Sequence, residues 1–130
     1  MFTVTVIDET TAGVRGDTWH LEIFEETLTL RELIRRRVFQ EVAEHNARAP
    51  EYFRGLVQPS DAEATLNGYK LRSKRRVDPE KQAATAMAAF ERNGFVVLVD
   101  DRQVEDLDAD LRLTMETRVT FLKLVPLVGG

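Results

Sequence analysis

The sequence predicts an α+β fold, because short runs with the apolar pattern of strands flank a segment with the apolar pattern of a long helix. Two runs near the start, at residues 2–6 and 19–23, alternate apolar with polar residues. Residues 30–46 carry apolar residues at helical spacing, and two more strand-like runs follow at 95–99 and 117–124. This order predicts a mixed sheet with the helix packed across one face.

The first two runs are expected to form a β-hairpin. Each has a period of two, which indicates a strand with one buried face, and a short loop with Gly13 and Gly16 separates them. Together with the helix and the later strands, they predict this buried core: Val4, Val6, Leu21, Ile23, Leu33, Ile34, Val38, Val97 and Phe121.

The helix at about 30–46 has a clear start signal. Thr29 and Glu32 form a capping box, and Leu28 and Leu33 are placed for a hydrophobic staple around it. The apolar positions fall on one stripe, made of Leu30, Leu33, Ile34, Val38 and Val42.

An inserted segment at about 47–94 separates this helix from the third main strand. Asn67-Gly68 predicts a small hairpin within it. Asp78-Pro79 has the pattern of an N-cap followed by proline at the first helical position, and Asn93-Gly94 that of a helix end. These signals predict a second helix at about 79–92, with Ala83, Met87 and Phe90 on one face.

The run at 95–99 is apolar throughout, whereas a strand buried on one face would normally alternate. Its outer side chains and those of the last strand are therefore expected to form an apolar patch. The patch is either exposed, as a binding surface, or covered by the inserted segment. Its members are Val96, Leu98, Leu122 and Leu124.

Size and composition predict a single domain over residues 1–130. The chain has 130 residues, no cysteine and a formal net charge of −4. Without cysteine, it has no thiol nucleophile, disulfide or cysteine-based metal site. The start of the chain does not resemble a signal peptide, and no run has the roughly 18 apolar residues that span a bilayer. We therefore expect a cytoplasmic protein that binds neither membrane nor nucleic acid.

The reactive side chains do not form a catalytic constellation, so we expect no enzyme activity, no metal site and no bound cofactor. His20 and His45 are far apart in the sequence and are expected to be surface or hydrogen-bonded histidines. Asp106, Asp108 and Asp110 lack the glycine and glutamate of a calcium loop, and a solvated acidic turn is expected instead. A basic run at 70–76 has the composition of a solvated loop, with docking to an acidic partner or RNA as the alternative.

The sequence ends in Gly129-Gly130, directly after the last apolar run. Glycine has no Cβ, so a terminal glycine pair can enter a narrow enzyme tunnel and present an unhindered carboxylate. The ordinary interpretation of such a pair is a frayed end. The functional interpretation rests on the elements that precede it, and it predicts a flexible tail at about 125–130.

Residues 98–107, Leu113 and residues 116–121 resemble the corresponding stretch of ubiquitin, in which a strand leads through a turn and a short strand to the final strand. The ending Val125-Pro-Leu-Val-Gly-Gly130 resembles that of bacterial sulfur carriers. With the long insertion, the combination resembles the larger ubiquitin-like proteins of bacterial conjugation systems. The resemblance implies a ubiquitin-like β-grasp fold with an inserted segment between the main helix and the third strand.

By this resemblance, the chain is expected to be a protein modifier. A partner activating enzyme would use ATP to adenylate Gly130, and thioesters would carry it through a conjugating enzyme to amines of target proteins. A JAB-type peptidase would act on the conjugates. Gly129 would keep the tail thin, and the partner-binding residues would be Val125, Pro126, Leu127, Val128, Leu98, Leu122 and Leu124. Two alternatives stay open: a sulfur carrier with a thiocarboxylate on Gly130, and a non-covalent β-grasp interaction module.

Overall fold

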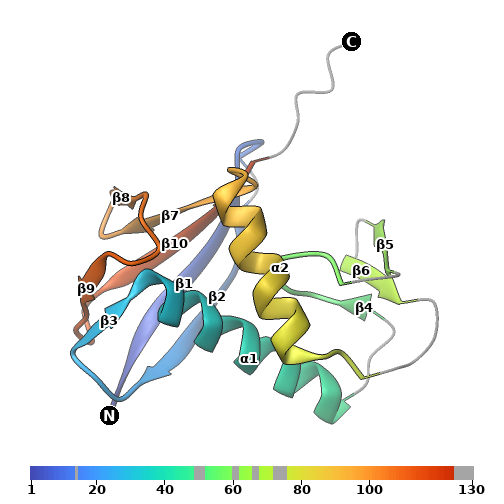
Figure 1. The fold of residues 1–130 in the computed structure, drawn as a ribbon, viewed down its shortest axis with the longest axis horizontal. Coiled ribbons are helices and arrows are strands. Elements are labelled where there is room, and N and C mark those ends of the chain that lie inside the picture. The colour runs from blue at the N-terminus through green and yellow to red at the C-terminus, as the bar shows by residue number, and fades with distance from the viewer. Residues whose placement is uncertain (14, 49–51, 60–61, 66–67, 72–75, 125–130) are drawn as a thin grey trace. The chain divides into compact units, whose positions relative to one another are not determined.

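The computed structural model describes residues 1–13, 15–48, 52–59, 62–65, 68–71 and 76–124. These residues form an α+β structure with two helices and ten strands (Figure 1). The chain divides into two compact units. We call residues 1–33 with 90–130 the sheet unit and residues 34–89 the middle unit. The helices α1 (Leu30–Arg48) and α2 (Pro79–Glu91) each contribute residues to both.

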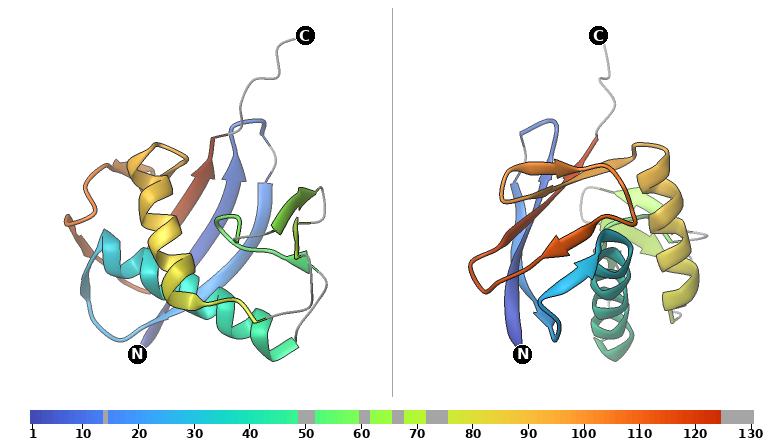
Figure 2. Two further views of the ribbon diagram at one scale, coloured as in Figure 1. Left: turned by 45° about the vertical axis from the view of Figure 1, so that its right-hand side comes forward. Right: turned by 60° about the vertical axis from the view of Figure 1, so that its left-hand side comes forward.

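The sheet unit is built on a mixed five-stranded sheet with the strand order β2-β1-β10-β7-β8. Its strands are β1 (Phe2–Thr10), β2 (Arg15–Ile23), β7 (Phe95–Val99), β8 (Arg102–Val104) and β10 (Arg118–Lys123). The first and last of these, β1 and β10, pair in parallel, and every other pair in this sheet is antiparallel. Figure 2 shows these strands side by side from two further directions. The predicted hairpin and strands are confirmed, and β1 and β2 extend beyond the predicted runs.

A second pairing within the sheet unit corrects the sequence analysis. Residues predicted as an acidic turn include a strand, β9 (Asp110–Arg112), which pairs antiparallel with β3 (Thr27–Thr29). Both strands have three residues, too short for a period of two to be recognised in the sequence. Leu28 and Leu111 face each other in this pair, and both are buried.

The core of the sheet unit includes the predicted alternating residues and further buried side chains, among them Phe90 and Phe95. Phe95, Phe121 and Phe90 form a tilted aromatic row, with ring centroids 6.1 Å apart for the first two and 5.8 Å for Phe90 and Phe95. Complete burial of a side chain of this size stabilises the fold by about 1.5–3 kcal/mol. The remaining predicted core residues of this unit are also buried: Val4, Val6, Leu21, Ile23, Leu33 and Val97.

The middle unit contains a small antiparallel sheet with the order β4-β6-β5. Its strands are β4 (Tyr52–Phe53), β5 (Ala62–Thr65) and β6 (Gly68–Leu71). The hairpin predicted around Asn67-Gly68 is confirmed by the pairing of β5 with β6, although Asn67 itself lies outside the described residues. β4 was not predicted, because two residues give no periodicity.

Both helices begin as predicted. The Thr29 hydroxyl oxygen accepts a hydrogen bond from the Glu32 backbone N–H at 3.1 Å, which caps α1. The Asp78 carboxylate caps α2 by accepting from the backbone N–H groups of Glu80 and Lys81, at 2.9 and 3.3 Å. The apolar stripe of α1 is buried over its whole length, at Leu30, Leu33, Ile34, Val38 and Val42.

Candidate functional site

The predicted conjugation tail lies outside the described residues; its members are Val125, Pro126, Leu127, Val128, Gly129 and Gly130. The structure describes the strand that leads into this tail and three predicted partner-binding residues, Leu98, Leu122 and Leu124. The candidate site is therefore built from the sheet as far as Leu124.

Strand alternation brings apolar side chains together on the face of the sheet opposite the core. Successive residues of a strand point to opposite faces, so residues that pair across strands share a face. Leu122 of β10 pairs with Val96 of β7, and Thr120 pairs with Leu98. On the other side of β10, Ile7 of β1 is the partner of Thr120. The pairing register thus places two β7 side chains and one β10 leucine in adjacent positions.

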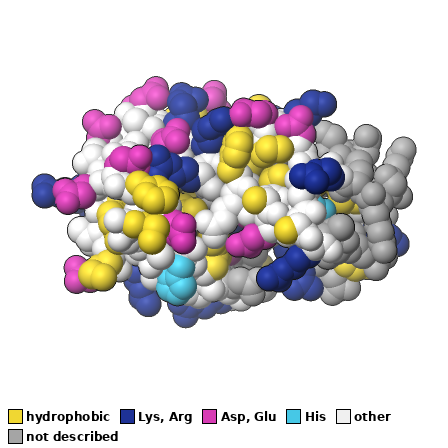
Figure 3. Space-filling view, turned by 90° about the horizontal axis from the view of Figure 1, so that it is seen from below, with side chains coloured by type: hydrophobic (Ala, Val, Ile, Leu, Met, Phe, Trp, Pro, Cys, Tyr) yellow, Lys and Arg dark blue, Asp and Glu magenta, His cyan; other side chains and the backbone are white. Residues whose placement is uncertain are grey.

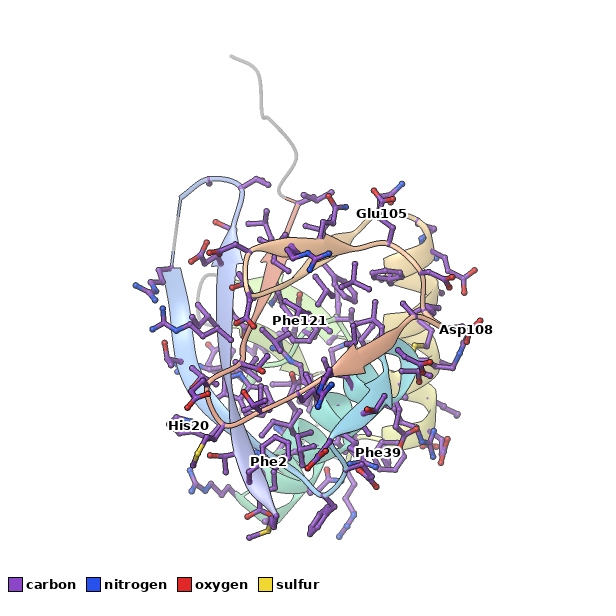
Figure 4. The ribbon with its side chains drawn as sticks, turned by 90° about the vertical axis from the view of Figure 1, so that its left-hand side faces the viewer. Phe2, His20, Phe39, Glu105, Asp108 and Phe121 are labelled. Carbon is purple, nitrogen blue, oxygen red and sulfur yellow. The ribbon has the colours of Figure 1, made fainter. Side chains whose placement is uncertain are left out.

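We call Val96, Leu98, Leu122 and Leu124 the sheet-face patch. Leu124 is 40% exposed, and the other three are half-buried. By contrast, Phe121 of the same strand is fully buried and lies in the interior in Figure 4. Of the four, Leu124 is exposed, and Leu98, Val96 and Leu122 reach solvent in part. Whether these residues bind a partner stays a prediction.

Hydrogen bonds hold the end of β10 on both sides. The Thr11 backbone N–H donates to the Lys123 carbonyl at 3.0 Å, and the Leu124 N–H donates to the Gly94 carbonyl at 3.2 Å. The backbone is therefore hydrogen-bonded to neighbouring segments of the same chain up to Leu124. The prediction that residues from Val125 onward are unpaired concerns residues outside the described part of the chain, and it stays a prediction.

The acidic segment that follows β8 forms a turn, and an ion pair links this turn to α1. The Asp106 carboxylate accepts a hydrogen bond from the Asp108 backbone N–H at 2.9 Å, and Asp108 forms an ion pair with Arg31 at 3.2 Å. Asp106 and Asp108 are exposed, as predicted for a solvated turn. Asp110 is also exposed but belongs to β9, and Leu107 and Leu111 are buried.

A hollow of about 540 Å³ lies beside this turn, within the sheet unit. Glu105 and Asp108 line it and project outward from the connection in Figure 4. Among the described residues, no group of three histidine, cysteine or carboxylate side chains is arranged to hold a metal ion.

The two histidines lie in different environments. His20 is exposed on β2 (Figure 4). His45 is buried on α1, where its ring meets the Phe53 ring edge-to-face with centroids 5.1 Å apart. Neither ring nitrogen of His45 has a hydrogen-bond partner among the described residues, so the expectation of a hydrogen-bonded histidine is wrong there. Burial lowers the pKa of His45, because desolvation disfavours the charged ring.

A buried polar cluster in the middle unit was missed from the sequence. Arg37 is only 2% exposed, and its Nε donates to the Glu41 carboxylate one helical turn away. The other Glu41 oxygen accepts from the backbone N–H of Leu56 at 3.1 Å. Burial, followed by the charge of Glu41, raises the pKa of Tyr69. A Cβ added at Gly55 would overlap the Phe53 ring and lie 2.6 Å from the Glu41 carboxylate, so glycine is required for this close approach.

The sequence carried one signal for this cluster. Arg37 and Glu41 are three and seven residues after Ile34, so they fall beside the apolar stripe rather than on the opposite face. A second cation of α1, Arg35, is at the surface. It donates two hydrogen bonds to Glu80, and this contact lowers the pKa of the Glu80 carboxyl.

Comparison with protein-family models, with curated proteins and with solved structures gives no match.

Within the described ranges, neither helix has the length and apolar content that crossing a membrane requires. The described side chains in Figure 3 carry both signs of charge, with basic and acidic groups interspersed.

Proposed function

We propose that this chain is a ubiquitin-like protein modifier with a β-grasp fold, activated at the carboxylate of Gly130. The observation that carries the proposal is the path of the last strand. β10 runs parallel to β1 in the middle of the sheet and is hydrogen-bonded as far as Leu124. The segment Val125-Pro-Leu-Val-Gly-Gly130 follows directly. In this proposal, the activating enzyme binds this segment.

The element order supports the β-grasp assignment. A hairpin, β1 and β2, is followed by α1, and the pair β7 and β8 then precedes the central strand β10. The last strand, β10, thereby lies between β1 and β7, which come from earlier parts of the chain. This explains how a stable domain would present a C-terminal segment from a rigid base.

The chemistry requires two partner enzymes, because a carboxylate is a poor electrophile. In the first step, a Gly130 oxygen attacks the α-phosphorus of ATP, and pyrophosphate leaves. A cysteine thiolate of the activating enzyme then attacks the acyl-adenylate, and AMP leaves with the bonding electrons. After transfer to a cysteine of a conjugating enzyme, a target amine attacks the thioester, forms an amide and releases the thiolate. A JAB-type peptidase would hydrolyse the resulting conjugates.

Within this proposal, the sheet-face patch and the tail have separate roles. The patch offers apolar area for docking of the activating enzyme beside the base of the tail. Pro126 fixes its own φ angle and has no N–H to donate, so it would end strand pairing there. Gly129 and Gly130 would then fit the narrow approach to the nucleotide.

A sulfur carrier is the second candidate, and the ending with Pro126 favours it. In that case a hydrosulfide ion supplied by a partner would attack the acyl-adenylate and AMP would leave, so that sulfur takes the place of one oxygen of Gly130. The middle unit disfavours this function, because a sulfur carrier needs only a compact domain and a free tail. A non-covalent interaction module would use the sheet-face patch alone.

The experiment begins with the intact mass of the natural protein, which shows whether Gly130 carries a free carboxylate. The purified chain is then incubated with ATP and an adenylating enzyme encoded next to it. A thiol-sensitive enzyme adduct followed by stable conjugates supports the modifier. Deletion of Gly130, or Gly129→Phe, should abolish the adduct and leave the circular dichroism spectrum unchanged.

Two outcomes would replace the proposal. A mass increase of the free protein that corresponds to exchange of one oxygen for sulfur would assign a carrier. If the Gly130 deletion behaves as the unaltered chain with every neighbouring enzyme, the tail has no covalent role. Leu98→Asp then becomes the informative variant, because an interaction module would lose its partner on this change alone.

A further inference from the structure

The middle unit contains a preformed apolar groove of about 440 Å³ along α1. Its floor includes a row of side chains at i, i+4 and i+8 of the helix, namely Phe39, Ala43 and Ala47. Ala43 and Ala47 are exposed, and Phe39 is half-buried; Figure 4 labels Phe39 on this helix. Residues at this spacing lie above one another on one face. The described part of α1 thus presents an apolar stripe that differs from its buried stripe.

The other wall of the groove is the segment that precedes α2, and two hydrogen bonds fix it to α1. The Asn46 side-chain amide donates to the Val77 carbonyl at 3.0 Å, and its oxygen accepts from the Val77 backbone N–H at 2.9 Å. Val77 is buried, and Pro79 restricts the backbone that follows. Because these hydrogen bonds fix its walls, the groove loses little conformational entropy when a ligand enters. This favours binding.

Among the described residues that line the groove, the charge has one sign. Arg76 is the cation, and none of these residues is aspartate or glutamate. Within the part of the chain that the structure describes, no carboxylate pairs with Arg76. Arg76 is also the last of five cations in the basic run 70–76. At the end nearer Phe39, Arg35 lies over the aromatic ring at 4.4 Å, but Glu80 already neutralises it.

We propose that this groove binds a short amphipathic, acidic helix of a partner protein. The small side chains of Ala43 and Ala47 let a second helix approach closely, so its large apolar residues can pack beside Phe39. A glutamate or aspartate of that helix would then lie near Arg76, which forms a charge-assisted hydrogen bond with a carboxylate. RNA fits less well, because a single-stranded nucleic acid needs several cations along its backbone and aromatic rings for stacking. The inference does not depend on the chemistry of Gly130.

The test uses the full isotope-labelled chain and a short blocked helical peptide of leucine, alanine and glutamate. Chemical-shift changes should gather at Ala43, Ala47 and Val77. A twin peptide with lysine in place of each glutamate should bind at least about tenfold more weakly. Ala43→Glu places bulk and a like charge in the floor and should weaken binding by about tenfold or more. Arg76→Glu should weaken it roughly fivefold to tenfold.

Matched controls make the result specific. Ala84 is exposed on α2 and does not line the groove, so Ala84→Glu should leave the affinity unchanged. Arg92→Glu is the corresponding control for Arg76→Glu. Four outcomes would overturn the proposal: equal binding of both peptides, shifts centred outside the groove, no shift at millimolar peptide, or tighter binding of an oligouridine that Arg76→Glu abolishes. Self-association of the free chain that Ala43→Glu abolishes would assign the groove to a second copy instead.

Discussion

The sheet unit and the middle unit are stabilised by different kinds of burial. In the sheet unit, the face of the main sheet that points to the core is apolar. Alternate residues of β1, β2, β7 and β10 form this face. In the middle unit, the buried Arg37 pairs with Glu41, whose side chain is 10% exposed, and His45 is buried without a hydrogen-bond partner among the described residues. When an apolar side chain is truncated, the free energy lost grows with the volume removed. A buried ion pair stabilises the fold only while both partners are present. The two units should therefore respond differently to single substitutions.

The largest effect is expected for Glu41→Gln. The change removes the carboxylate that faces the buried Arg37 guanidinium and that accepts from the Leu56 backbone N–H. Removal of one partner of a buried ion pair costs about 3–5 kcal/mol. Urea unfolding should show this decrease in the free energy of unfolding. Hydrogen exchange should locate the earliest loss of protection in residues 34–89.

A double variant separates the ion pair from simple packing. Arg37→Met with Glu41→Leu removes both charges and keeps apolar volume. Replacement of a complete buried pair in this way is often neutral or stabilising. We therefore expect the double variant to be more stable than Glu41→Gln. If both variants lose the same free energy, the pair contributes shape rather than charge balance, and the contrast between the units is wrong.

The next effect is expected in the sheet unit, for Leu21→Ala. Leu21 is 2% exposed and pairs with Val4 across the hairpin. Truncation of a buried leucine costs about 2–5 kcal/mol, as lost burial and a residual cavity. Leu21→Met, which nearly conserves volume, should cost less than about 1.5 kcal/mol. Chemical denaturation of both variants measures this, and a methionine variant as unstable as the alanine variant would contradict it.

The same contrast explains which parts were predictable from the sequence. The period of two at Val4, Val6, Leu21 and Ile23 specifies a strand and its buried face, so this part of the core of the sheet unit was found from the pattern alone. The partial exposure of Leu98 and Leu124 also agrees with the expected apolar patch.

The rest depended on contacts between residues that are distant in the sequence. Arg37 is a charged residue in a helix, and only the approach of Leu56 and Gly55 to Glu41 shows why it is buried. The groove beside Ala43 likewise exists because Asn46 binds a segment that lies 31 residues away. No local pattern contains these contacts.

A smaller effect, equal in the two units, is expected at the helix caps. Thr29 caps α1 from the sheet unit, and Asp78 caps α2 from the middle unit. Thr29→Ala and Asp78→Ala should each cost about 1 kcal/mol, with a range of about 0.5–2, because each leaves backbone N–H groups without their acceptor. Thr29→Ser and Asp78→Asn keep an acceptor and serve as controls. A cost at one cap several times that at the other would show that one helix depends on its cap far more.

The smallest effect is a dependence on pH that arises from His45. Burial lowers the pKa of His45 in the folded chain below its unfolded value near 6.5, so the unfolded state binds the proton more readily. The stability that His45 confers as a neutral ring is complete above about pH 6.5. It is lost progressively as the pH falls from there toward the lower folded pKa.

Unfolding in urea at about pH 8 and about pH 5.5 should therefore show a larger loss of stability for the unaltered chain than for His45→Gln. His20→Gln, at an exposed position, should behave as the unaltered chain. If His45→Gln has the same pH dependence as the unaltered chain, the His45 ring has a partner that stabilises its charged form. The middle unit would then contain one more complete polar contact, and its contrast with the apolar sheet unit would rest on Arg37 and Glu41 alone.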